Sequence, residues 1–116
     1  MRSILAIVTT LFVSVFLLAA SEKTYHITKT KNERIELTRN DFTLTFGEIE
    51  LTDQDELSMV LNITQKETVR QVLVVYANNT PAIVEITGYR LVFSDISQDE
   101  EDNSLYNIEL TIYPLY

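Results

Sequence analysis

The residues that could do chemistry in this 116-residue chain are one histidine and two groups of carboxylates. His26 is the sole histidine, and the chain contains no cysteine. A Ser-His-Asp arrangement would have to use His26, but no Gly-x-Ser-x-Gly motif accompanies it. Thiol nucleophiles are excluded, and one histidine is too few for a transition-metal site. We therefore expect no catalytic residue and no cofactor, with His26 a surface side chain.

The carboxylates could supply oxygen ligands to calcium from two loops. The calcium candidates are Asp53, Asp55, Glu56, Asp99, Glu101 and Asp102. Their spacing does not match the EF-hand pattern, and neither loop contains a glycine for a tight wrap around an ion. Carboxylate pairs for glycoside hydrolysis need a cleft, which so small a domain seldom builds. The sequence thus predicts no metal site and a protein that is not an enzyme.

Charge is unevenly distributed along an acidic chain with a formal net charge of −8. Residues 40–116 carry three cations against fourteen carboxylates, whereas the segment 23–39 is basic. The acidic balance argues against nucleic acid and anionic lipid as partners. We expect the basic segment to bind a protein partner, and the candidate residues are Lys29, Lys31, Arg34 and Arg39.

The first residues have the pattern of a secretory signal. Met1-Arg2-Ser3 is cationic, Ile4 to Leu18 is apolar, and Ala19-Ala20-Ser21 offers small residues for cleavage. We predict a cleaved signal peptide over 1–21 and one domain over 22–116, the alternative being an uncleaved N-terminal anchor. Because a small secreted animal domain usually carries disulfides, the lack of cysteine favours a bacterial exported protein, periplasmic or secreted.

Apolar and polar residues alternate over short stretches of the remaining chain, which is typical of half-buried strands. The predicted strands lie within 24–30, 34–38, 42–51, 57–64, 69–77, 82–93 and 106–112. No segment after the signal has the 3.6-residue period of a helix. The unbroken apolar run Val72 to Tyr76 predicts a central strand buried on both faces. Residues 94–104 are the most hydrophilic and are predicted to be a solvated loop.

The alternation changes phase at the two glycines of the chain, Gly47 and Gly88. A two-residue hairpin turn would explain each change, and so would a β-bulge. We favour a hairpin at Gly47-Glu48 and weigh the two explanations nearly equally at Thr87-Gly88. A turn at Gly88 would place Glu85 opposite Arg90.

Seven to nine short strands in about a hundred residues predict an all-β protein, a single small antiparallel β-sandwich of immunoglobulin-like type. A small closed β-barrel is the alternative.

Two functions are compatible with this domain. The first is an exported, non-enzymatic binding or assembly/adaptor module that engages another cell-envelope or extracellular protein through a strand edge or sheet face. The alternative is a carrier of a small ligand or of an ion such as calcium, with a pocket lined by tyrosines. The tyrosines considered are Tyr25, Tyr76, Tyr89, Tyr106 and Tyr113.

Overall fold

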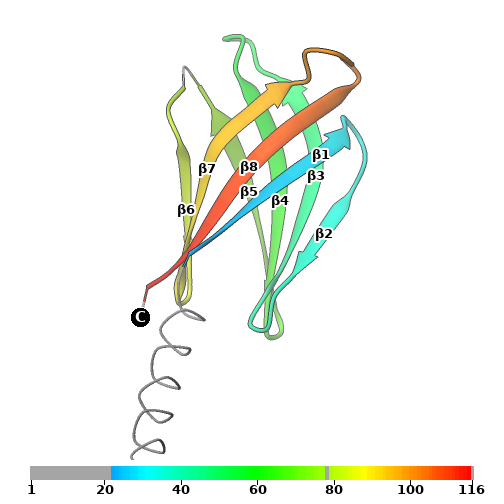
Figure 1. Cartoon of the computed structure of the whole chain (residues 1–116). Helices are drawn as coiled ribbons and strands as arrows, with labels where there is room; N and C mark the ends of the chain where they lie inside the picture. Colours follow the sequence, from blue (N-terminus) through cyan, green and yellow to red (C-terminus); the bar gives the residue numbers. More distant parts are fainter. Residues whose placement is uncertain (1–21, 78, 116) are drawn as a thin grey trace, which may run out of the picture.

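The computed structural model describes residues 22–77 and 79–115, which fold into eight β-strands (Figure 1). The strands are β1 (Lys23–Thr30), β2 (Ile35–Thr38), β3 (Thr43–Leu51), β4 (Leu57–Gln65), β5 (Thr68–Tyr76), β6 (Ala82–Ile86), β7 (Tyr89–Gln98) and β8 (Leu105–Pro114). The described residues contain no helix. The predicted all-β class and the number of strands are confirmed.

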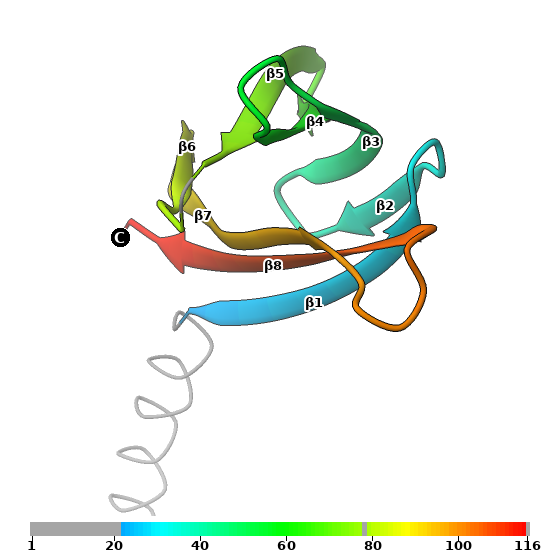
Figure 2. The same ribbon diagram turned by 90° about the horizontal axis from the view of Figure 1, so that it is seen from above.

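The strands form two four-stranded antiparallel sheets that face each other as two layers (Figure 2). One sheet has the order β1-β8-β7-β6 and the other β2-β3-β4-β5. Every hydrogen-bonded neighbour is also adjacent in sequence, apart from the pair β1 and β8. The β-sandwich prediction is therefore confirmed. Its immunoglobulin-like detail is not confirmed: apart from the neighbours β1 and β8, both sheets are built from sequential hairpins, whereas immunoglobulin sheets are joined by Greek-key connections.

The core lies between the layers, where alternate residues of the two sheets meet. β3 and β4 contribute residues such as Leu44 and Leu61, and β7 and β8 contribute residues such as Leu91 and Leu110, all fully buried. The rings of Phe46 and Phe93 meet edge to face across the layers at 6.5 Å between centroids. Burial of each such side chain stabilises the fold by roughly 1.5–3 kcal/mol.

The two glycines turn out to have different structural roles. Gly88 has a φ of 86° in the turn between β6 and β7, and Glu85 pairs with Arg90 as the hairpin requires. The predicted hairpin at Gly47 is wrong, because β3 runs through it as one strand with a register shift between Phe46 and Ile49. The competing bulge explanation is correct there.

The sequence predicted a solvated loop over residues 94–104, and this is wrong for residues 94–98. β7 continues through them to Gln98, with a register shift between Phe93 and Asp95. The extra residue at this bulge lets Phe93 and Ile96 both face the core, although they are three positions apart. The period-two pattern is broken at the bulge, which concealed the strand.

β5 is an edge strand and not a central one, so that prediction is also wrong. Its residues alternate between the core face, where Val74 is buried, and the outer face, where Val69 and Leu73 are exposed. The apolar run Val72 to Tyr76 therefore supplies both faces of β5, although only one face packs against the core and the other meets solvent.

Within the two described ranges, no helix is long and apolar enough to cross a membrane. The predicted signal peptide over 1–21 lies outside the described residues.

Candidate functional site

The sandwich has two sides at which the edge strand of one sheet adjoins the edge strand of the other. β1 and β2 form one of these sides, and β5 and β6 form the other. The two sides differ in how they are held together, and this difference locates the candidate site.

The side of β1 and β2 is tied by a buried lysine. Lys29 is fully buried, and its Nζ donates hydrogen bonds to the carbonyl oxygens of Thr30 at 2.8 Å and of Gly47 at 2.9 Å. Next to it, the Ile49 amide donates to the carbonyl oxygen of Lys31 at 3.0 Å. The chain after β1 is thereby attached to the bulge in β3. Burial lowers the pKa of Lys29, and the Glu33 carboxylate partly opposes that shift.

This burial removes Lys29 from the predicted partner-binding cluster. Lys29 has the inward parity of Tyr25 and Ile27 on β1, so its ammonium group satisfies carbonyl oxygens of the fold and is not offered to a partner. The burial of Lys29 could not be predicted from the sequence, because its acceptor, the Gly47 carbonyl oxygen, lies at the bulge in β3.

The other basic candidates do not act as one group. Arg39 is half-buried and its Nη1 donates to the hydroxyl of Tyr25 at 2.9 Å. Lys31 and Arg34 are exposed in the turn between β1 and β2. The outward positions of β1 itself, such as His26 and Thr28, are polar. This edge therefore has little apolar surface for a partner.

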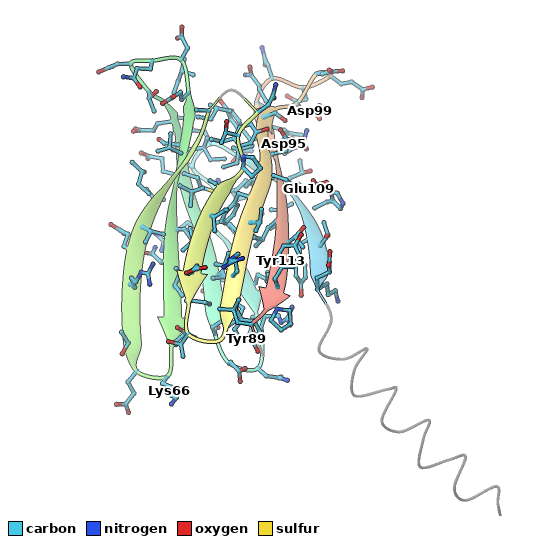
Figure 3. All side chains as sticks on the ribbon, turned by 90° about the vertical axis from the view of Figure 1, so that its left-hand side faces the viewer. Lys66, Tyr89, Asp95, Asp99, Glu109 and Tyr113 are labelled. Carbon is cyan, nitrogen blue, oxygen red and sulfur yellow. The ribbon has the colours of Figure 1, made fainter. Side chains whose placement is uncertain are left out.

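The side of β5 and β6 is bridged by side chains that reach across to main-chain groups. Figure 3 shows Lys66 and Tyr89 at the same end of the sandwich. The Gln65 side-chain amide donates to the Thr87 carbonyl oxygen at 3.1 Å and accepts from the Thr87 amide at 3.4 Å. Arg70 Nη1 donates to the Glu85 carbonyl oxygen at 3.3 Å. Because β5 and β6 belong to different sheets, the backbone edge of β5 is not paired by β6.

The outward face of β5 is mostly apolar, with Gln71 as its polar residue. Val69 and Leu73 retain 67% and 61% of their accessible surface, Val75 is also exposed, and Ile83 on β6 retains 60%. Natural edge strands are usually protected by lysine, proline or a bulge. β5 has no lysine, proline or bulge, and its pairing with β4 is continuous from Gln65↔Thr68 to Leu57↔Tyr76. Its one charged residue is Arg70, whose side chain donates to the Glu85 carbonyl oxygen at the β6 side. An edge of this kind favours pairing with a further strand.

A hollow of about 320 Å³ lies at the end of this side where β5 begins. Ile63 and Ile86 provide its buried apolar residues. Lys66 and Arg70 are exposed at the same hollow, together with Gln65, Thr68 and Thr87. Ion pairs within the described ranges join His26 to Glu109 and Arg90 to Glu85, and neither involves these two cations. A second hollow of about 300 Å³ shares Gln65, Lys66 and Thr87 and extends to Tyr89 and Asp41.

The two acidic loops are held by side-chain hydrogen bonds to their own backbone. Asp99 accepts from the Asn107 side chain and from the amides of Glu101 and Asp102, and these hydrogen bonds lower the pKa of Asp99. Asp102 accepts from the hydroxyl and amide of Ser104, which lowers the pKa of Asp102 as well. In the other loop, the Thr52 hydroxyl oxygen accepts from the amides of Gln54 and Glu56.

No group of three or more potential metal ligands converges anywhere in residues 22–77 and 79–115. The calcium candidates Asp53, Asp55, Glu56, Asp99, Glu101 and Asp102 are therefore not brought together in a metal site within that part of the chain.

His26 is exposed on β1, with Nδ1 3.5 Å from Glu109 Oε2. The Ser94 hydroxyl donates to the other oxygen of the same carboxylate. The carboxylate thus stands between serine and histidine, whereas activation of a serine requires the histidine to contact the hydroxyl. This arrangement cannot work as a nucleophilic triad.

The tyrosines do not share one pocket. Tyr25, Tyr76 and Tyr106 pack against the core. Tyr113, on β8, lies opposite Arg90 of β7, and Tyr89 lines the second hollow. The Tyr89 hydroxyl donates to Asp41 Oδ2 at 2.6 Å, and this bond raises the pKa of Tyr89.

The β5 edge and its hollow are what the sequence reasoning missed. Arg70 was the available signal, because its parity is that of the inward residues Val72 and Val74. A cation at that position is incompatible with a strand buried on both faces.

No protein-family model, curated protein or solved structure matches this chain.

Proposed function

We propose that this protein is an exported, non-enzymatic binding module that accepts an extended segment of another cell-envelope or extracellular protein as an additional strand on β5. The observation that carries the proposal is the unpaired edge of β5 with its exposed valines and leucine.

Two physical features support strand addition at this edge. An edge strand directs part of its N–H and C=O groups away from its own sheet, and a partner strand satisfies them. Val69, Gln71, Leu73 and Val75 stand at alternate outward positions, so a partner's alternate side chains would pack beside three apolar residues and one amide. Main-chain bonds would then supply affinity and side-chain contacts specificity.

The test compares two substitutions to lysine at outward positions of the two edges. Leu73→Lys places a charge on the outer face of β5, and the matched control Thr28→Lys does so on β1. Tagged versions of the wild type and both variants are used to recover partners from an envelope extract. We expect the wild type and Thr28→Lys to recover the same partner and Leu73→Lys to lose it. Far-UV circular dichroism should show all three folded.

Equal recovery by the two variants, or loss with Thr28→Lys alone, would contradict binding at β5. Failure of the wild type to recover any protein would count against a partner-binding module.

A further inference from the structure

The two ends of β5 differ chemically, and the difference predicts what the bound segment must be. The end at Tyr76 is followed by Ala77, which forms an isolated bridge with Thr80 ahead of β6. The end at Thr68 opens onto the 320 Å³ hollow with its two cations.

Strand direction determines which end of a partner reaches the hollow. Every strand pair in this sandwich is antiparallel, and antiparallel pairing is the more stable arrangement per residue. A strand that adds antiparallel to β5 runs from Tyr76 toward Thr68. Its carboxyl end therefore arrives at Gln65, Lys66 and Arg70.

The charge at the hollow is complementary to a carboxylate. Residues 40–116 contain three cations, and two of them, Lys66 and Arg70, line this hollow, while the third, Arg90, is paired with Glu85. Within the described residues Arg70 donates to one acceptor, the Glu85 carbonyl oxygen, and a guanidinium group has five N–H donors. It therefore has donors left for a carboxylate, and Lys66 adds a second positive charge beside it.

The hollow also has an apolar part. Ile63 and Ile86 are buried beneath the polar rim and belong to opposite sheets. A ligand group that combines a carboxylate with an apolar side chain matches both surfaces, and the last residue of a protein chain provides that combination.

We infer that the segment bound by β5 is the C-terminus of its partner, with the free α-carboxylate held by Lys66 and Arg70 and an apolar last side chain in the hollow between Ile63 and Ile86. This inference rests on the proposed function and names its partner class: proteins that end in an extended segment with alternating apolar residues and an apolar final residue.

The test uses one peptide, Gly-Ser-Lys-Thr-Val-Thr-Val-Leu, labelled with fluorescein at its N-terminus and made as the free acid and as the C-terminal amide. Fluorescence anisotropy against the full chain at low salt measures both affinities. We expect the free acid to bind at least about tenfold more tightly than the amide, because charge-assisted hydrogen bonds are the stronger ones. Salt should weaken the binding of the acid more than that of the amide.

Variants then locate the difference. Lys66→Gln with Arg70→Gln should reduce the affinity for the acid to that for the amide. The matched control, Lys31→Gln with Arg34→Gln, removes the same charge from the other side of the sandwich and should retain the tenfold preference. Lys66→Gln alone, in an exposed turn, should give part of the effect and keeps the test valid if the double variant fails to fold.

The outcomes separate this inference from the proposed function. Equal binding of acid and amide, both sensitive to Leu73→Lys, overturns the carboxylate inference and leaves strand addition at β5 standing. A preference for the acid that survives loss of Lys66 and Arg70 also overturns it. No binding of either peptide contradicts both.

Discussion

At the scale of single residues, Lys29 shows how one buried charge connects the two sheets. Its Nζ reaches the carbonyl oxygen of Gly47, on the opposite sheet, and so satisfies an acceptor at the bulge of β3. An unsatisfied buried acceptor costs about 1–3 kcal/mol, and a buried ammonium group is itself unfavourable unless it is well hydrogen-bonded.

Replacing Lys29 by methionine should therefore change how stability depends on pH. Because the pKa of Lys29 is lower in the folded than in the unfolded state, the charged form weakens the fold at pH values below the folded pKa. That penalty is relieved as pH rises toward 10.5, the ordinary lysine value. The free energy of unfolding of the wild type should thus rise, relative to Lys29→Met, as alkaline pH approaches 10.5.

Urea unfolding at a series of pH values between neutral and alkaline measures this difference, with Lys31→Met as the control at an exposed neighbouring lysine. A wild-type advantage over Lys29→Met that does not change with pH would show that Lys29 titrates normally and is not held as described.

Gly88 offers a second prediction at this scale. Its φ of 86° lies in the region that β-branched residues avoid, so Gly88→Val should destabilise the fold by about 1–3 kcal/mol. Gly88→Asn should cost less, since asparagine tolerates positive φ. Thermal unfolding compares the two, and equal melting temperatures for wild type and Gly88→Val would rule out the turn geometry.

At the scale of strands, the bulge in β7 determines which residues form the core. Ile96 is only 1% exposed. It reaches the core because β7 continues past Ser94 and the extra residue of the bulge shifts the inward-facing positions. Ile96→Ala should therefore cost about 2–5 kcal/mol, the range for buried aliphatic truncations. Ile83→Ala, at an exposed position of β6, should cost less than about 1 kcal/mol. Similar small losses for both would place Ile96 in a solvated loop.

Period-two alternation was enough to predict most of these strands from sequence. It located β1, β4 and β8, in which inward residues recur at every second position; Ile27, Leu61 and Leu110 are examples. At Gly88 the sequence left a hairpin and a bulge nearly equally weighted, and the pairing of β6 with β7 shows the hairpin.

Bulges and edges were harder to predict, for a physical reason. A turn and a bulge both change the phase of the pattern, so Gly47 and Ser94 are ambiguous until the pairing of β3 and β7 is known. The edge position of β5 and the burial of Lys29 depend on which strands lie beside them. That information comes from the whole topology, and a local window of sequence does not contain it.

At the scale of the whole molecule, the two sides of the sandwich are chemically distinct. The side of β1 and β2 is closed by Lys29 and has polar outward residues, whereas the side of β5 and β6 is bridged by side chains and has apolar ones. The remaining acidic surface repels other acidic proteins, and the β5 side interrupts it with Lys66 and Arg70. The molecule as a whole therefore favours one edge for strand addition.

Amide hydrogen exchange, resolved by residue with NMR, tests this claim most directly. The full chain is measured alone and with the free-acid peptide Gly-Ser-Lys-Thr-Val-Thr-Val-Leu. In the free protein, amides of β5 that point away from β4 should exchange quickly, because no strand pairs with them. The peptide should slow exchange along β5 from Thr68 to Tyr76 and leave β1 unchanged. Protection that appears on β1, or peptide binding without any slowing on β5, would contradict the account.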